Sequence, residues 1–101
     1  MERVLISYDI PENGVKKLKQ KFEVDINYAD KPISKEYLFK HINKYFGIIT
    51  MLFDEIDKKV LDAARDNVEI ISNYAVGYDN IDIEEATKRG IVVFNTPTGN
   101  T

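Results

Sequence analysis

The chain has 101 residues, 44% of them apolar, and a formal net charge of −3 from 14 basic and 17 acidic side chains. This length fits one small domain with a hydrophobic core. The lack of cysteine excludes disulfides and thiolate chemistry, and the interspersed charges indicate neither a nucleic-acid nor a membrane partner. No apolar run approaches the roughly 20 residues that span a bilayer, so we expect a cytoplasmic protein.

The first part of the chain predicts two strands and two helices in alternation. Residues 4–6 form an apolar run typical of a buried strand, and Pro11 suits the first turn of the helix that follows. Residues 23–28 alternate charged and apolar side chains, which indicates a strand at the edge of a sheet. Ser34 is a suitable N-cap for the second helix. The apolar faces of the two helices are expected at Val15, Leu18 and Phe22, and at Leu38, Ile42 and Tyr45.

The alternation continues through the middle of the chain. Residues 46–50 form a nearly uninterrupted apolar run, as expected for a buried strand of a parallel sheet, and residues 68–72 are the fourth predicted strand. Between them, Asp57 is predicted to cap a third helix. The inward-facing residues of this helix are expected to be Val60, Leu61 and Ala64.

The last part of the chain predicts a fourth helix and a fifth strand. Asp82 and Glu85 form a capping-box pattern, and Gly90 is a natural residue just beyond the end of that helix. Residues 91–94 form the last apolar run. Five strands alternating with four helices favour an α/β fold, a flavodoxin-like three-layer α/β/α sandwich whose parallel sheet has the order 2-1-3-4-5.

Four crossover helices cannot cover both faces of a five-stranded sheet. We therefore expect exposed apolar surface, which is usually an interface. A homodimer through this surface is one way to cover it. The alternative is a small domain that tolerates the gap.

Ligands of open parallel sheets bind at the carboxyl ends of the strands, where two loops carry candidate site residues. The loop after the third strand presents Met51, Leu52 and Phe53 in a row. These residues either line a small apolar pocket or pack on a neighbouring loop. In the loop of residues 73–80, Gly77 permits a backbone bend whose N–H groups could hold a carboxylate. The alternative is an ordinary strand-to-helix turn.

This second loop and the residues after it resemble a known family. Residues 73–82 (NYAVGYDNID), with 89–91 (RGI) and 95–97 (Asn-Thr-Pro), resemble the D-isomer-specific 2-hydroxyacid dehydrogenases, and most of all the glyoxylate and hydroxypyruvate reductase branch. Residues 99–101 resemble the phosphoglycerate dehydrogenase branch at the hinge into the cofactor domain. The resemblance is specific over residues 68–101 and general before them.

The resemblance implies a role for five residues. Val76 and Gly77 would offer backbone amides to the carboxylate of the substrate. Met51 and Leu52 would line the pocket around its short tail. Asn100 would lie at the hinge, close to where the substrate meets the nicotinamide.

The resemblance also implies what lies beyond this chain. Residues 1–101 would be one flavodoxin-like substrate domain that ends at the hinge. No G-x-G-x-x-G follows a strand, so the NAD(P)-binding Rossmann domain is expected to be absent, and we assign no cofactor, metal or catalytic residue here. The intact enzyme would use NAD(H) or NADP(H), with its catalytic Arg, Glu and His beyond the hinge. This chain alone is expected to be an inactive fragment.

The expected ligand is a small 2-oxo or 2-hydroxy acid, bound weakly. Branches that bind phosphorylated substrates commonly place an arginine in the loop after the third strand, and this chain has none there. Glyoxylate or hydroxypyruvate is therefore the expected substrate of the intact enzyme. Asp79 and Asn80 are expected to hold the loop in shape rather than to touch the substrate.

A receiver domain of the same fold is the alternative function. Asp54 lies near the place of a phosphoacceptor. However, a receiver needs an acidic pair after the first strand to hold Mg²⁺, and only Asp9 is available. It also needs a lysine where Asn95 stands. The single histidine, His41, is expected to be a solvated surface residue.

Overall fold

The computed structural model describes residues 1–8, 10–27, 31–75 and 77–95. Strands and helices alternate along the described chain as predicted. The strands are β1 (Arg3–Ile6), β2 (Glu23–Ile26), β3 (Gly47–Thr50), β4 (Ile70–Asn73) and β5 (Val92–Asn95). The helices are α1 (Glu12–Lys19), α2 (Lys35–His41), the 3-10 helix η1 (Ile42–Lys44), α3 (Lys58–Ala64) and α4 (Ile83–Lys88).

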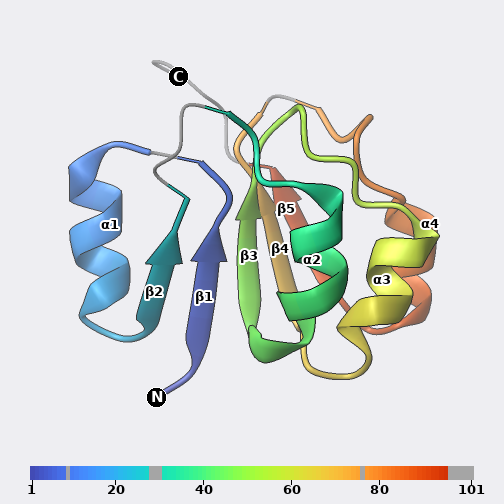
Figure 1. Cartoon of the computed structure of the whole chain (residues 1–101), viewed down its shortest axis with the longest axis horizontal. Coiled ribbons are helices and arrows are strands. Elements are labelled where there is room, and N and C mark those ends of the chain that lie inside the picture. Colours follow the sequence, from blue (N-terminus) through green and yellow to red (C-terminus); the bar gives the residue numbers. More distant parts are fainter. Residues whose placement is uncertain (9, 28–30, 76, 96–101) are drawn as a thin grey trace.

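The five strands form one parallel sheet in the order β2-β1-β3-β4-β5 (Figure 1), which confirms the predicted flavodoxin-like topology. One row of the register pairs Leu5 with Ile48, Ile48 with Ile71, and Ile71 with Val93. All four side chains belong to the larger core cluster or pack against it. The register therefore aligns apolar side chains from four strands on the face that α2 and α3 cover.

The predicted helix starts are confirmed by side-chain caps. Ser34, Asp57 and Asp82 each accept a hydrogen bond from the backbone N–H three residues later, at 3.0–3.1 Å. In a full capping box, the Glu85 side chain would accept from the Asp82 N–H. Here the Asp82 N–H donates instead to the Ile56 carbonyl oxygen at 2.9 Å. Gly90 has a φ of +75°, as expected for the residue that follows a helix end.

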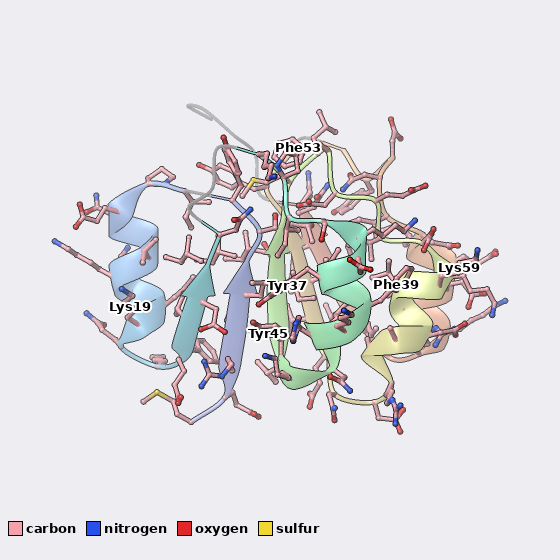
Figure 2. The ribbon with its side chains drawn as sticks, viewed as in Figure 1. Lys19, Tyr37, Phe39, Tyr45, Phe53 and Lys59 are labelled. Atoms are coloured by element: carbon pink, nitrogen blue, oxygen red, sulfur yellow. The ribbon has the colours of Figure 1, made fainter. Side chains whose placement is uncertain are left out.

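Two details of the apolar faces differ from the prediction. α1 ends at Lys19, so Phe22 lies beyond the helix and stacks on Phe46 with ring centroids 5.8 Å apart. The second helix tightens into η1 after His41, although Ile42 and Tyr45 are still buried as predicted. Figure 2 shows Tyr45 directed toward the sheet, where its hydroxyl donates to Asp25 at 2.7 Å.

Helices lie on both faces of the sheet, but they cover them unequally. α1 packs against β2 on one face, whereas α2, α3 and α4 share the larger core cluster on the other. Val92 and Phe94, which alternate with the core-facing Val93, are 51% and 54% exposed. The predicted uncovered apolar surface therefore lies at β5. None of the described helices is long and apolar enough to cross a membrane.

Candidate functional site

The buried polar side chains of the described residues gather at the carboxyl end of the sheet. Ser7, Thr50 and Asn73 stand at the ends of β1, β3 and β4, and each is at most 1% exposed. Asp54 follows β3 and is 3% exposed. Burying a polar group destabilises a fold unless it is hydrogen-bonded. The four buried groups at this edge therefore indicate a region that is organised by hydrogen bonds.

Asn73 connects this edge to the loop of residues 73–80. The Thr50 hydroxyl donates to Asn73 Oδ1 at 2.9 Å. Asn73 Nδ2 in turn donates to the carbonyl oxygen of Gly77 at 2.8 Å and to Asn80 Oδ1 at 2.9 Å. The end of β4 therefore holds the backbone of the loop at Gly77.

Asn80 joins that loop to the 51–54 turn after β3. Its Nδ2 lies 2.9 Å from the Met51 carbonyl oxygen and 2.8 Å from that of Asp54. The prediction that Asn80 holds the loop in shape is confirmed by these contacts, while Asp79 is exposed. The two candidate loops therefore form one hydrogen-bonded unit.

The carboxylate of Asp54 closes the 51–54 turn from inside. Asp54 Oδ2 accepts a hydrogen bond from the Ser7 hydroxyl and another from the Met51 N–H at 2.7 Å. Burial raises the pKa of Asp54, and these two hydrogen bonds oppose the rise. The receiver alternative finds no support here, because a phosphoacceptor carboxylate has to be accessible to its phosphate donor.

Gly77 presents an open backbone at this site. It is exposed, and a Cβ built on it would meet nothing within 4 Å. Its N–H has no acceptor among the described residues. That Gly77 permits a backbone bend which holds a carboxylate stays a prediction. Val76 and Asn100, the other backbone and hinge candidates, lie outside the described residues.

The three apolar residues of the 51–54 turn lie in different environments, and only Phe53 matches one of the two predicted alternatives. The Met51 side chain is 6% exposed and packs with Ile6 and Val15 in the smaller core cluster. Phe53 packs on a neighbouring loop, edge-on to Tyr8 with ring centroids 5.5 Å apart. Figure 2 shows Phe53 at the end of the molecule toward which the strands point. Leu52, 63% exposed, is accessible to a ligand.

The charge of the two loops is negative. The 51–54 turn and the 73–80 loop contain two aspartates and neither lysine nor arginine. A carboxylate that bound here would therefore depend on backbone N–H groups, as in other anion-binding concavities. Within the described residues, no group of histidine and acidic side chains is arranged to hold a metal ion.

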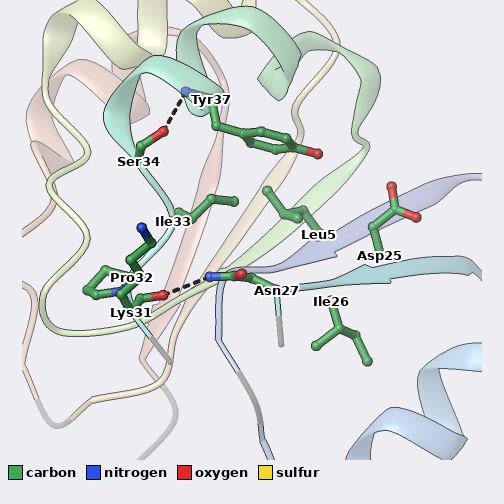
Figure 3. A pocket seen from close by; sticks show the side chains of 9 residues that line it. All are labelled: Leu5, Asp25, Ile26, Asn27, Lys31, Pro32, Ile33, Ser34 and Tyr37. Atoms are coloured by element: carbon green, nitrogen blue, oxygen red, sulfur yellow. Dashed lines mark hydrogen bonds between the residues drawn. The ribbon is translucent and has the colours of Figure 1, made fainter. Parts of the chain in front are cut away.

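A cavity of about 410 Å³ lies elsewhere, between the end of β2 and the start of α2 (Figure 3). Two of its polar side chains already have structural roles: Ser34 caps α2, and Asp25 accepts from Arg3 and Tyr45. We therefore place the candidate site at Gly77 and the 51–54 turn, where the buried polar side chains converge. The cavity is lined by Leu5, Asp25, Ile26, Asn27, Lys31, Pro32, Ile33, Ser34 and Tyr37.

Residues 4–101 match the model of the D-isomer specific 2-hydroxyacid dehydrogenase catalytic domain. The chain belongs to the D-isomer specific 2-hydroxyacid dehydrogenase family. The resemblance noted in residues 68–101 is thereby confirmed, and the match extends it over nearly the whole chain. The family's catalytic-domain model covers both loops of the candidate site.

Individual proteins are similar to this chain in sequence or in fold. A glyoxylate reductase of Thermococcus kodakarensis is 50% identical over 95 residues, which are 94% of this chain and 28% of the relative. A crystal structure from Pyrococcus horikoshii OT3 has a TM-score of 0.86 at 35% identity and covers 94% of this chain and 27% of that one.

A third 2-hydroxyacid dehydrogenase relative carries ligands in its crystal structure. It is the NADPH-dependent glyoxylate/hydroxypyruvate reductase of Sinorhizobium meliloti in complex with NADP and malonate. The TM-score is 0.65 at 28% identity, over 95% of this chain and 28% of that chain. This chain therefore spans little more than a quarter of the length of the relatives that it matches.

Proposed function

We propose that this chain is the carboxylate-binding part of an NAD(P)-dependent reductase for a small 2-oxo acid such as glyoxylate or hydroxypyruvate. The observation that carries the proposal is the exposed Gly77 amide, held beside the 51–54 turn by Asn73 and Asn80. A rigid backbone donor suits a carboxylate, which must be clamped so that the adjacent carbonyl faces the hydride.

The cytoplasmic location of the protein stays a prediction.

The proposed contacts follow from the same geometry. Gly77, with Val76 beside it in the chain, offers N–H groups to the carboxylate. Leu52 provides apolar surface for a short tail. The Met51 N–H donates to Asp54 Oδ2, which fixes the turn that carries Leu52. Asn100 is the residue proposed for the hinge. A phosphorylated substrate is disfavoured, since the 51–54 turn contains no arginine.

The turn between β1 and α1 does not fit the pyrophosphate of a dinucleotide cofactor. A pyrophosphate is bound at a glycine-rich turn between a strand and a helix N-terminus. Here Ser7 and Tyr8 follow β1, and the first turn of α1 carries the acidic Glu12. NAD(H) or NADP(H) would therefore be bound by other residues of the enzyme, and we expect no hydride transfer by this chain alone.

The relatives support the choice of substrate class. A 50%-identical relative is named a glyoxylate reductase. The Sinorhizobium meliloti reductase was crystallised with malonate, a small carboxylate, together with NADP. Carboxylate binding and nicotinamide chemistry therefore occur together in one relative of this fold.

The test separates acid binding from catalysis. The ¹⁵N-labelled chain is titrated with glyoxylate while its amide resonances are followed, and the Gly77 amide is expected to move. Glyoxylate with NADH or NADPH is expected to leave the absorbance of the reduced nicotinamide unchanged. Acid-induced shifts confined to other regions would overturn the proposed site. Steady oxidation of NADH or NADPH above a blank would overturn the proposal that this chain binds the acid but does not transfer hydride.

A further inference from the structure

We propose that Asp54 is a positioning residue: when ionised, its carboxylate holds the 51–54 turn against the carboxylate-binding loop, and when protonated it releases that turn. The proposal rests on the proposed function for the identity of the ligand. We call the Asp54 carboxylate with its hydrogen bonds from Ser7 and Met51 the latch. The existence of the latch does not depend on which ligand is bound. The proposal assigns a regulatory role to a side chain that does not touch the substrate.

The first step is the geometry of the turn. Asp54 Oδ2 accepts from the Met51 N–H at 2.7 Å, and the Asp54 N–H donates to the Met51 carbonyl oxygen at 3.0 Å. The same carboxylate oxygen accepts from the Ser7 hydroxyl at the end of β1. One carboxylate therefore closes the turn on itself and ties it to a neighbouring strand.

The second step links this turn to Gly77. Asn80 Nδ2 donates to the carbonyl oxygens of Met51 and Asp54. Asn80 Oδ1 accepts from Asn73 Nδ2, which also donates to the Gly77 carbonyl oxygen. A change in the turn therefore reaches Gly77 through two asparagine side chains.

The third step is electrostatic. Asp54 is 3% exposed, and both donors to its carboxylate are uncharged groups. Burial disfavours the charged form and raises the pKa of Asp54, so protonation occurs at a higher pH than for an exposed aspartate. Loss of the negative charge weakens the hydrogen bonds that the carboxylate accepts.

The neighbouring charges belong to other pairs. On the side of α2, Lys35 Nζ lies 2.9 Å from Glu55 and 2.6 Å from Asp57, which precede α3. Of the described titratable side chains around the turn, Tyr8 packs on Phe53, and Lys35 and Glu55 line one hollow together with Asp54. Asp57 reaches this group through Lys35, and Asp79 in the 73–80 loop is exposed. Because Lys35 is shared between two other carboxylates, it is not free to act as the counter-ion of Asp54.

The experiment is a pH titration of the ¹⁵N-labelled chain without ligand. The Met51 and Gly77 amide resonances are expected to move together, with one midpoint above the ordinary aspartate value of about 3.9. Ser7→Ala should shift this midpoint upward, because the hydroxyl no longer stabilises the ionised carboxylate. Asp54→Asn should remove the transition. Glu55→Gln, a neighbouring exposed carboxylate, is the matched control and should leave the midpoint unchanged.

Several outcomes would overturn the latch. They are a transition at Met51 that persists in Asp54→Asn, a midpoint that Ser7→Ala leaves in place, or different midpoints at Met51 and Gly77. If a variant fails to fold, as judged by circular dichroism, the two midpoints in the wild-type chain still decide.

A glyoxylate titration above and below the midpoint tests the link to the ligand. Binding is expected to weaken about tenfold at the lower pH, the order expected when one hydrogen bond to a charged group is lost. Equal affinity at both pH values would overturn the coupling to the site. If glyoxylate binds at neither pH, the proposed function fails. The latch is then tested only by the midpoints of the Met51 and Gly77 amides.

Discussion

Asn80 and Met51 are 29 residues apart in the sequence, yet the Asn80 side-chain amide donates to the Met51 carbonyl oxygen at 2.9 Å. This contact joins the loops that follow β3 and β4, which lie side by side in the sheet. The candidate site is therefore a product of strand order.

Asn80→Ala is expected to lower the free energy of unfolding by about 1–3 kcal/mol, because two carbonyl oxygens of the 51–54 turn lose their shared donor. Urea denaturation followed by circular dichroism measures the change. Asp79→Ala, at the exposed neighbouring position, is the control and should have little effect. Equal effects of the two substitutions would contradict the structural role of Asn80.

Gly77→Ala is expected to fold like the wild-type chain and to bind glyoxylate more weakly. The added methyl group meets nothing within 4 Å, but it stands beside the proposed donor. Gly90→Ala is the matched control: its φ of +75° makes alanine unfavourable, by about 1 kcal/mol, away from the site. Calorimetric titration and thermal unfolding of both variants should therefore give opposite patterns.

Asp57→Ala is expected to destabilise the chain by about 1 kcal/mol through the loss of the α3 N-cap. The hydrogen bond from Lys35 holds the pKa of Asp57 below its ordinary value. A depressed carboxyl pKa contributes stability above the unfolded-state value of 3.8 and loses it as the pH falls further. The difference between wild type and variant should therefore shrink below that pH.

The control for this prediction is Asp57→Ser, which keeps a capping oxygen and removes the charge. It should recover most of the stability at neutral pH and flatten the acid dependence. An acid dependence as steep as that of the wild type would show that the Lys35 pair is not its source.

The homodimer predicted from the uncovered sheet face stays a prediction, and Phe94→Ser tests it. Phe94 is 54% exposed on β5, so a polar residue there should reduce self-association measured by sedimentation velocity. Phe39→Ser, at a 40% exposed residue of α2, is the control and should leave self-association unchanged. A wild-type chain that is monomeric at every concentration would rule out this dimer.

Much of the fold could be predicted because it depends on local patterns. Ser34, Asp57 and Asp82 mark helix starts through contacts within three residues. Where packing between distant segments decides, prediction was weaker. Phe22 leaves the face of α1 to stack on Phe46, 24 positions further along, and no periodicity within the helix signals that partner.

The candidate site was predicted only in part. Gly77 and Leu52 are exposed at the expected edge, but the Met51 side chain lies in the core. The sequence did not predict the hydrogen-bonding roles of Ser7, Thr50 and Asn73, although each is a polar residue at the end of a predicted strand. That position is a usable signal, since the carboxyl ends of parallel strands meet at one edge of the sheet.

By itself, the sequence of this protein determined the alternation of strands and helices, three of the four helix caps and the family, all of which depend on short runs of neighbouring residues. Only the tertiary structure decided that Asp54 is enclosed, because its partner Ser7 lies 47 positions away on another strand. Burial and hydrogen bonding between distant residues arise when the sheet assembles, and these properties set the pKa of Asp54 and the shape of the site.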